Sequence, residues 1–188
     1  MMPRTTSIFA LVGALSLAAL TPGLGQEGHE FMPKGGKTLL IELLGSPPDA
    51  TQLREFAQGE HSEEEWSNTL GEHTSAMSEQ EWRTLVAYLA VNMPLPEGAL
   101  EKAESQGDAT AALPPDGRRL AWNECQFCHS LFSSHLTQDR DVQAWLNMFE
   151  SPFHREIKMS TQRREIFARY SAINMPMQVE DVPTELRF

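Results

Sequence analysis

The sequence feature best suited to chemistry is the string Cys125-Gln126-Phe127-Cys128-His129, which contains both cysteines of this 188-residue chain. Two thiols three residues apart, followed at once by an imidazole, form the pattern by which c-type haem is attached. On one helical turn the two sulfurs can reach the two vinyl groups of a single porphyrin, and the histidine then comes beneath the iron. The motif therefore predicts one covalent haem c, with His129 as the proximal iron ligand.

The first 25 residues predict export of the protein. Arg4 is the only charge before a run of 13 mostly apolar residues, Ile8 to Leu20, and Gly23-Leu24-Gly25 follows as a small-x-small cleavage site. This three-part plan is typical of a secretory signal peptide. The apolar run is shorter than the roughly 20 residues that a membrane span needs. We therefore expect cleavage after residue 25 and a periplasmic or otherwise exported protein with no membrane span.

Three other uses of the motif stay open on the residues alone. A thioredoxin-like redox pair requires a βαβ context, and no strand-like alternation flanks the cysteines. A zinc site requires four ligands, usually with a second ligand pair, and the sequence has no second cysteine pair. The third alternative is a structural disulfide. The complete C-x-x-C-H match in a chain with an export signal favours haem.

Helical periodicity surrounds the motif. A short helix is predicted from Gly117 into the cysteines, and residues 142–149 place apolar side chains at i, i+3, i+4 and i+7. The last predicted helix covers residues 161–173. Loops are expected over residues 130–138 and 153–160. These elements predict an all-α fold.

Residues 113–177 resemble a class I-type cytochrome c domain. The resemblance rests on the Gly117 to Leu120 lead-in, the C-x-x-C-H string, the Trp145 helix and the closing Tyr170-Ser-Ala-Ile-Asn-Met-Pro176. It implies a small helical bundle around one haem, with the motif histidine as proximal ligand. The distal ligand in that family is usually a methionine in the loop before the C-terminal helix. The chain departs from the family in lacking a Gly-Pro soon after the motif.

Several side chains are candidates for the distal ligand, because thioether sulfur suits haem iron and imidazole also binds it. Met159 is favoured, since it lies in the predicted loop before the last helix. Met175 is the runner-up, together with Met177, although no helix fits into the residues that follow. His154, His135 and an open iron are the remaining alternatives.

The first half of the chain contains a weaker copy of the second. Residues 77–94 align without a gap to residues 159–176, with eight identities in 18 positions. Trp66 pairs with Trp145 if a three-residue gap is allowed, and Gly35-Gly36-Lys37 corresponds to the lead-in at Gly117. Such self-similarity indicates an internal duplication. At this register the three haem-binding positions of the first copy hold Leu43, Ser46 and Pro47.

The first copy is therefore expected to be a cytochrome c-like repeat without haem. Two capping-box sequences, Ser62 to Glu65 and Ser78 to Glu81, predict helix starts within it. Met77, the counterpart of Met159, is present in this copy although the copy binds no iron. Part of the match between Met159 and the family's ligand position can therefore reflect packing at the start of a helix. The expected organisation is a signal peptide over 1–25, a haemless repeat over 26–96, a linker over 97–116 and a haem domain over 117–188.

The charge of the chain divides along the same boundary. The formal net charge is −11, with 15 Lys+Arg and 26 Asp+Glu. Residues 26–116 contain 5 of these basic and 17 of the acidic residues, whereas residues 117–188 contain nine of each. The acidic balance argues against nucleic-acid binding. The acidic half either steers a basic redox partner or is simply a solvated surface.

The expected function is single-electron transfer through a His/Met-ligated haem, because a six-coordinate iron leaves no open position for catalysis. The protein is then an electron carrier rather than an enzyme. It acts as a free carrier or as the cytochrome subunit of a periplasmic dehydrogenase. The pattern of the motif, Trp145 and Met148 is similar to that of such subunits. The expected partner is a redox protein, such as the dehydrogenase catalytic subunit. Alternatives are a gas sensor or peroxidase-like enzyme with an open distal site, and an assembly protein in which haem is structural.

Overall fold

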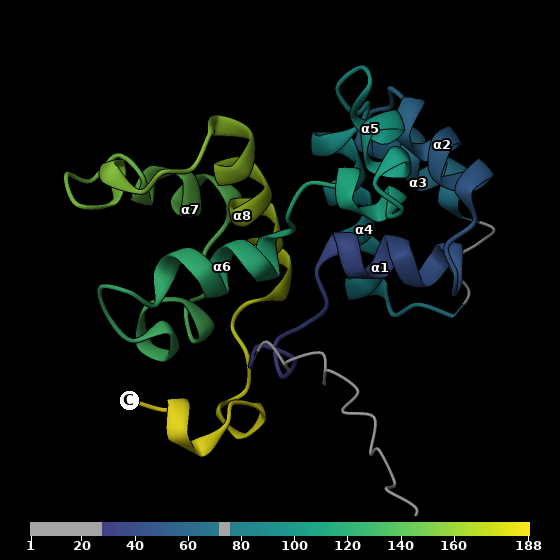
Figure 1. The fold of residues 1–188 in the computed structure, drawn as a ribbon. Coiled ribbons are helices and arrows are strands. Elements are labelled where there is room, and N and C mark those ends of the chain that lie inside the picture. The colour runs from purple at the N-terminus through teal and green to yellow at the C-terminus, as the bar shows by residue number, and fades with distance from the viewer. Residues whose placement is uncertain (1–27, 72–75) are drawn as a thin grey trace, which may run out of the picture.

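The computed structural model describes residues 28–71 and 76–188, and the predicted signal peptide lies outside them. Within the described residues the regular structure is helical and contains no strand, which confirms the all-α prediction. Figure 1 shows two groups of helices joined near the centre of the molecule. The elements are α1 (Gly36–Leu44), α2 (Ala50–Gln58), α3 (Glu63–Leu70), α4 (Glu79–Asn92), α5 (Ala99–Ser105), η1 (Ala109–Ala112), α6 (Gly117–Cys125), η2 (Phe132–Leu136), α7 (Val142–Met148), η3 (His154–Glu156), α8 (Thr161–Asn174), η4 (Val179–Asp181) and η5 (Thr184–Leu186). No helix in the part of the chain that the model covers has the length and apolar character to cross a membrane.

The helix starts follow the capping chemistry that the sequence predicts. Ser62 and Ser78 accept the backbone N–H groups of Glu65 and Glu81, and each glutamate carboxylate accepts the N–H of its serine. Both predicted capping boxes are therefore confirmed. In the second half α8 begins at Ser160, whose hydroxyl accepts an N–H from the first turn. These bonds satisfy donors that a helix start otherwise leaves without partners.

One predicted loop contains more helix than expected, and the predicted linker contains the helical turns that its Ala and Glu residues suggest. The predicted loop over residues 130–138 contains η2, a π-helical turn that buries His135 and Leu136. The predicted linker over residues 97–116 contains α5, which buries Leu100 and Ala103, and the short turn η1. In both cases buried side chains stabilise helical turns that are too short to give a periodic pattern.

The first half (residues 28–96) and the second half (residues 117–188) are built in the same way. Helix α4 packs on α8 at the centre; α1 and α3 pack on α4, as α6 and α7 pack on α8. Helices α4 and α8 each have 14 residues. Asn92 and Asn174 stand at their last positions, and each donates its side-chain amide to the carbonyl of a tyrosine four residues earlier, at 2.9 Å.

The first helices of the two halves match at a register that differs by one residue from the predicted one. A Cβ added to Gly36 would lie 2.1 Å from Cβ of Tyr88, and one added to Gly117 would lie 2.1 Å from Cβ of Tyr170. Gly36, rather than Gly35, thus takes the place of Gly117. The gap-free alignment misplaced it because glycine occupies both positions. Cys125, Cys128 and His129 then correspond to Leu44, Pro47 and Pro48.

Several hydrogen bonds between the halves are reciprocal. Gln80 of α4 donates its side-chain amide to the carbonyl of Ile173 at 3.5 Å, and Gln162 of α8 donates to the carbonyl of Val91 at 3.0 Å. Each member of one bond has its equivalent, 82 positions away, in the other. Reciprocal contacts of this kind define an isologous, two-fold interface. The two halves therefore pack around an approximate two-fold axis.

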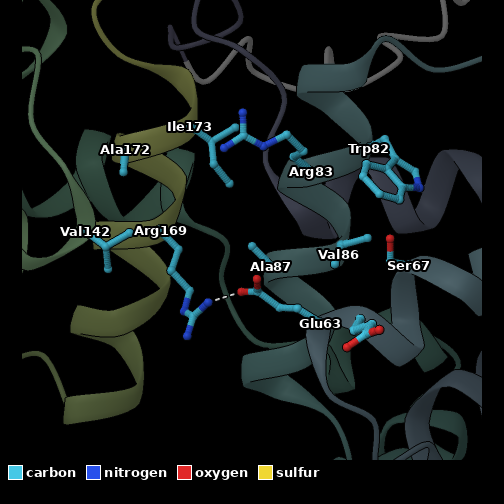
Figure 2. Close-up of a pocket in the computed structure, with 11 residues that line it drawn as sticks. Glu63, Ser67, Trp82, Arg83, Val86, Ala87, Val142, Arg169, Ala172 and Ile173 are labelled. Atoms are coloured by element: carbon cyan, nitrogen blue, oxygen red, sulfur yellow. Dashed lines mark hydrogen bonds and ion pairs between the residues drawn. The ribbon is translucent and has the colours of Figure 1, made fainter.

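The arrangement is not exactly symmetric on the outer side of the interface. A cavity of about 430 Å³ lies between residues of α3 and α4 on one side and residues of α7 and α8 on the other, and Figure 2 shows the side chains that line it. Arg169 of α8 crosses it to pair with Glu63, and also binds Glu165 at 2.8 Å. The equivalent position on α4 is Ala87. Burial lowers the pKa of the Arg169 guanidinium.

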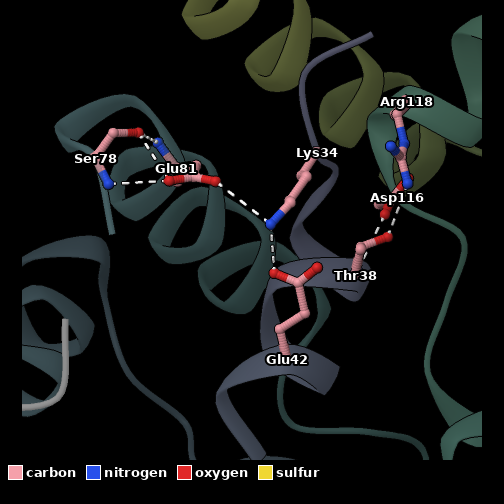
Figure 3. Close-up of polar contacts among 7 residues, drawn as sticks. All are labelled: Lys34, Thr38, Glu42, Ser78, Glu81, Asp116 and Arg118. Carbon is pink, nitrogen blue, oxygen red and sulfur yellow. Dashed lines mark hydrogen bonds and ion pairs between the residues drawn. The ribbon is translucent and has the colours of Figure 1, made fainter. Parts of the chain in front are cut away.

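The helix starts of α1 and α6 meet at one buried carboxylate. One oxygen of Asp116 accepts the N–H of Arg119 at 3.1 Å and so caps α6. The other lies 3.5 Å from the N–H of Thr38, in the first turn of α1. The N-cap of α1 is Gly35, which has no side chain, and a Cβ there would lie 2.0 Å from Cγ of Asp116. Arg118 adds a bond of 3.1 Å to the Thr38 hydroxyl (Figure 3).

We predict that Gly36→Ala and Gly117→Ala destabilise the protein to a similar degree. Each added methyl group meets a buried tyrosine at its Cβ, and overpacking of this kind costs about 1–3 kcal/mol. Urea unfolding measures the loss. Gly71→Ala is the control, because a Cβ there meets its nearest atoms only at 3.5 Å. A loss in Gly71→Ala as large as in the other two variants would contradict the prediction.

Candidate haem site

The motif begins inside a helix and continues past its end. Cys125 is the last residue of α6 and is half-buried, whereas Cys128 and His129 lie beyond the helix and are exposed. Both cysteines are free thiols. Burial, with a smaller contribution from the Glu124 carboxylate, raises the pKa of Cys125 to about 12. The Cys125 thiol is therefore protonated at neutral pH and faces a less polar environment than Cys128.

A groove of about 440 Å³ lies beside the motif. Cys128 and His129 form part of its wall, and apolar side chains from four segments of the chain form much of the rest. These side chains are Phe31 before α1, Trp122 of α6, Leu131, Phe132 and Leu136 after the motif, and Leu186 and Phe188 at the C-terminal end. The volume lies within the range of small-molecule and cofactor sites, which are mostly apolar with a few placed polar groups.

Exposed aromatic side chains gather around this groove. Phe127, Phe153 and Phe188 are 79%, 88% and 77% exposed, which makes them the most exposed large apolar residues of the described chain. Phe127 and Phe188 line the groove, and Phe153 precedes His154, which contacts His129. Grouped exposed apolar residues mark ligand or protein binding sites, whereas scattered ones need no explanation.

The imidazole of His129 is available for ligation. The structure gives it a ring contact with His154, at 5.9 Å between ring centres and nearly perpendicular, and within the described residues no hydrogen bond occupies its nitrogens. Nδ1 of His154 lies 3.2 Å from the carbonyl of Met148 and 3.0 Å from the hydroxyl of Ser151. The Ser151 hydroxyl can donate to Nδ1 or accept from it, so these contacts engage Nδ1 in either tautomer of His154.

A buried polar cluster lies behind the groove. His135 has its Nε2 at 2.8 Å from the hydroxyl of Ser171, which itself donates to the carbonyl of Phe167. His135 therefore donates from Nε2, and its Nδ1 has no partner among the described residues. Burial, and to a lesser degree the charge of Arg140, lowers the pKa of His135 to about 3. Trp145 contacts this ring, and its indole N–H is also buried without a partner.

The candidate distal methionines are buried rather than exposed in the groove. Met159 lies directly before the N-cap of α8, in the segment where the sequence places it, and Met175 follows the last residue of α8. Met177 is half-buried and donates its backbone N–H to the carbonyl of Leu136. None of the three is among the residues that line the groove. The identity of the distal ligand stays a prediction.

Part of the groove was not predictable from the sequence. Phe31 and the C-terminal residues Leu186 and Phe188 belong to segments without helical periodicity, and Phe31 lies 94 positions before Cys125. The only sequence signal at Phe31 is its place shortly before the glycine lead-in of the first half.

The alternatives for the motif receive no support from the described residues. The thioredoxin-like pair needs strands, and residues 28–71 and 76–188 contain none. No group of three or more His, Cys, Asp or Glu side chains in these ranges is arranged to hold a metal ion. The cysteines are not joined in a disulfide.

Comparison with known proteins gives no relative. No protein-family model matches the chain, and no curated protein or solved structure matches it either. The motif, the groove and the packing of this chain are therefore the features that bear on its function.

We predict that His135 makes the stability of the protein sensitive to acid. Its pKa is about 3 in the folded protein and 6.5 when exposed, so the unfolded chain binds more protons between these values. Stability then falls as the pH is lowered from about 6.5 towards 3, by up to about 1.4 kcal/mol per pH unit for one proton. Urea unfolding at several pH values measures this slope.

The matched variant is His135→Phe, because Phe56 stands in the equivalent place against Trp66 in the first half. This variant should have a smaller slope over the same pH range. An unchanged slope would show that other groups cause the acid sensitivity.

Proposed function

We propose that this protein is an exported c-type cytochrome that transfers single electrons through one haem, bound covalently by Cys125 and Cys128 with His129 as the proximal iron ligand. The observation that carries the proposal is the position of the C-x-x-C-H string. The string begins at the last residue of α6, directly beside an apolar groove. Within the described residues no hydrogen bond occupies the ring nitrogens of His129. When bound, the haem supplies an iron that cycles between the ferrous and ferric states.

The donor set and the groove fit a haem. The groove offers aromatic and aliphatic walls to a flat apolar ring, and His129 offers it an axial nitrogen. A haem also carries two propionate groups, which need hydrogen-bond donors where they are shielded from water. Within the described residues the indole N–H of Trp145 has no partner and the Arg140 guanidinium lies 5.0 Å above the same ring, but neither residue lines the groove. The packing of the motif helix α6 on the last long helix, α8, agrees with the small-bundle resemblance.

We propose further that the first half is a duplicated copy that has no haem. The equal lengths of α4 and α8, their matching asparagine and tyrosine contacts and the reciprocal glutamine bonds support common descent of the halves. At the observed register the haem-binding positions of the first half hold Leu44, Pro47 and Pro48. None of these can form a thioether or bind iron.

Met159 remains the proposed distal ligand. Its counterpart Met77 precedes the capping serine of α4, and Trp82 stands five residues after it, which is the pattern of a hydrophobic staple. Packing thus accounts for Met77. The residue at the same spacing from Met159 is Arg164, so the same staple pattern is absent there, although Met159 is itself buried in the hydrophobic core. His154 is the alternative to Met159 near the iron, because its ring contacts that of His129. If His154 stands beside an iron with an open distal position, the haem is suited to ligand binding or peroxidase-like chemistry.

The proposed partner is a redox protein, with the protein as a free carrier or as the cytochrome subunit of a dehydrogenase. The exposed phenylalanines beside the groove support a transient apolar contact there. The acidic first half supports attraction of a basic partner at low salt.

We predict that the protein, exported from a host with haem-attachment machinery, carries one haem that survives denaturation and acid extraction. The double variant Cys125→Ala, Cys128→Ala should lose it, because no thioether bond can form. Mass spectrometry of the denatured protein measures the attachment. Phe127→Ala is the control and should keep the haem, since it changes the motif without removing a thiol. Covalent haem in the double variant would sink the proposal.

We predict that the oxidised protein shows the weak far-red charge-transfer band of a sulfur–iron bond, and that Met159→Ala abolishes it. Met77→Ala, the same change at the equivalent place in the first half, and Met175→Ala should both retain the band. Loss of the band only in Met175→Ala would move the ligand to that residue. A high-spin spectrum without the band in the unmodified protein would instead favour an open iron and ligand-binding or peroxidase-like chemistry.

A further inference from the structure

The first half reaches across the molecule to the groove beside the motif. Residues 28–33, here called the lead-in segment, precede α1 but pack against Trp122 of α6. The rings of His29 and Phe31 lie 5.9 and 6.2 Å from that indole, and a Cβ on Gly28 would lie 3.1 Å from it. Phe31 meets Trp122 edge-on, and both rings line the groove together with Cys128 and His129.

A buried tyrosine hydroxyl of the second half binds the lead-in segment. Tyr170 of α8 donates to the carbonyl of Pro33 at 2.7 Å. The mirror-image bond runs from Tyr88 of α4 to the carbonyl of Pro114, at 2.8 Å, and holds the segment that precedes α6. Each half thus holds the segment that leads into the other. Only the bond from Tyr170 secures a segment at the groove.

We infer that the lead-in segment of the haemless half is a working part of the haem site: Phe31 positions and shields the haem, and so sets its reduction potential and its access to small ligands. The inference rests on the proposed function. Its physical basis is the placement of an aromatic ring, anchored through Pro33, in the wall beside the proximal histidine. It gives the haemless half a direct role in electron transfer.

The expected effect follows from solvation. Ferric haem carries one more positive charge than ferrous haem, and water stabilises that charge better than an apolar wall does. Phe31 therefore raises the potential by excluding water, and its ring limits the entry of small molecules into the groove. Its removal should lower the potential and ease ligand entry.

The test uses the full-length, haem-loaded protein and two pairs of variants. Phe31→Ala removes a ring from the wall of the groove. Phe56→Ala is its control, because Phe56 is also half-buried and belongs to the same half but does not line the groove; its ring stacks on Trp66, with 5.7 Å between the ring centres. Tyr170→Phe removes the hydroxyl that binds the carbonyl of Pro33, and Tyr88→Phe removes the equivalent hydroxyl in the other half. Redox titration gives the potential, and optical titration with imidazole gives the ligand affinity.

We expect a lower potential and a several-fold tighter imidazole affinity in Phe31→Ala and, more weakly, in Tyr170→Phe. Phe56→Ala and Tyr88→Phe should match the unmodified protein in both measurements. If Phe31→Ala does not fold, Phe31→Leu keeps an apolar wall with less cover and should shift both quantities in the same direction.

Three results would overturn the inference. Equal shifts in a variant and its matched control would mean general loosening of the fold. Unchanged values in Phe31→Ala and Tyr170→Phe would mean that the segment has no part in the site. A higher potential in Phe31→Ala would contradict the shielding argument. An unmodified protein that attaches no haem would instead refute the proposed function, so the two failures are distinguishable.

Discussion

The architecture depends on one buried carboxylate, that of Asp116. A helix start leaves backbone donors without partners, and a buried start cannot leave them to water. Asp116 accepts the N–H of Arg119 in α6 and lies within reach of the N–H of Thr38 in α1. The absence of a side chain at Gly35 makes room for it. One side chain thus fixes the first helix of each half relative to the other, and α6 is the helix that presents the motif.

The two-fold packing also explains where the halves differ. Some positions at the interface between α4 and α8 keep matching side chains, such as Gln80 with Gln162 and Tyr88 with Tyr170, whereas Thr84, which accepts from Asn174, corresponds to Ile166. One inward-facing position has changed in character. Phe56 on Trp66 in the first half becomes His135 on Trp145 in the second, and His135 donates a hydrogen bond to the Ser171 hydroxyl. The polar pair lies in the half that contains the C-x-x-C-H motif.

The sequence predicted the long elements well because their signals are local. The apolar spacing and the capping serine that define α8 lie within a single stretch, and the helix covers Thr161–Asn174 against a prediction of 161–173. Both capping boxes were predictable for the same reason. The π-helical turn at Phe132–Leu136 was not, because its stability comes from burial of His135 against side chains far along the chain. The groove beside the motif was predictable only in its cysteines and histidine, since Phe31 and Phe188 reach it through tertiary packing.

In each half, a tyrosine binds the segment that precedes the first helix of the other half, and this has an evolutionary consequence. Because Tyr170 binds Pro33 and Tyr88 binds Pro114, neither half completes its own surroundings. When one half performs the chemistry, substitutions at the corresponding positions of the other half have no effect on that chemistry. The helices of that other half stay under selection as long as the functional half packs against them. The interface pairs Gln80 with Gln162 and Tyr88 with Tyr170 keep their identity, while the thiols and the imidazole have no counterpart in the first half. In a chain with two such halves, contacts on which both halves depend are lost less readily than a binding site that only one half uses.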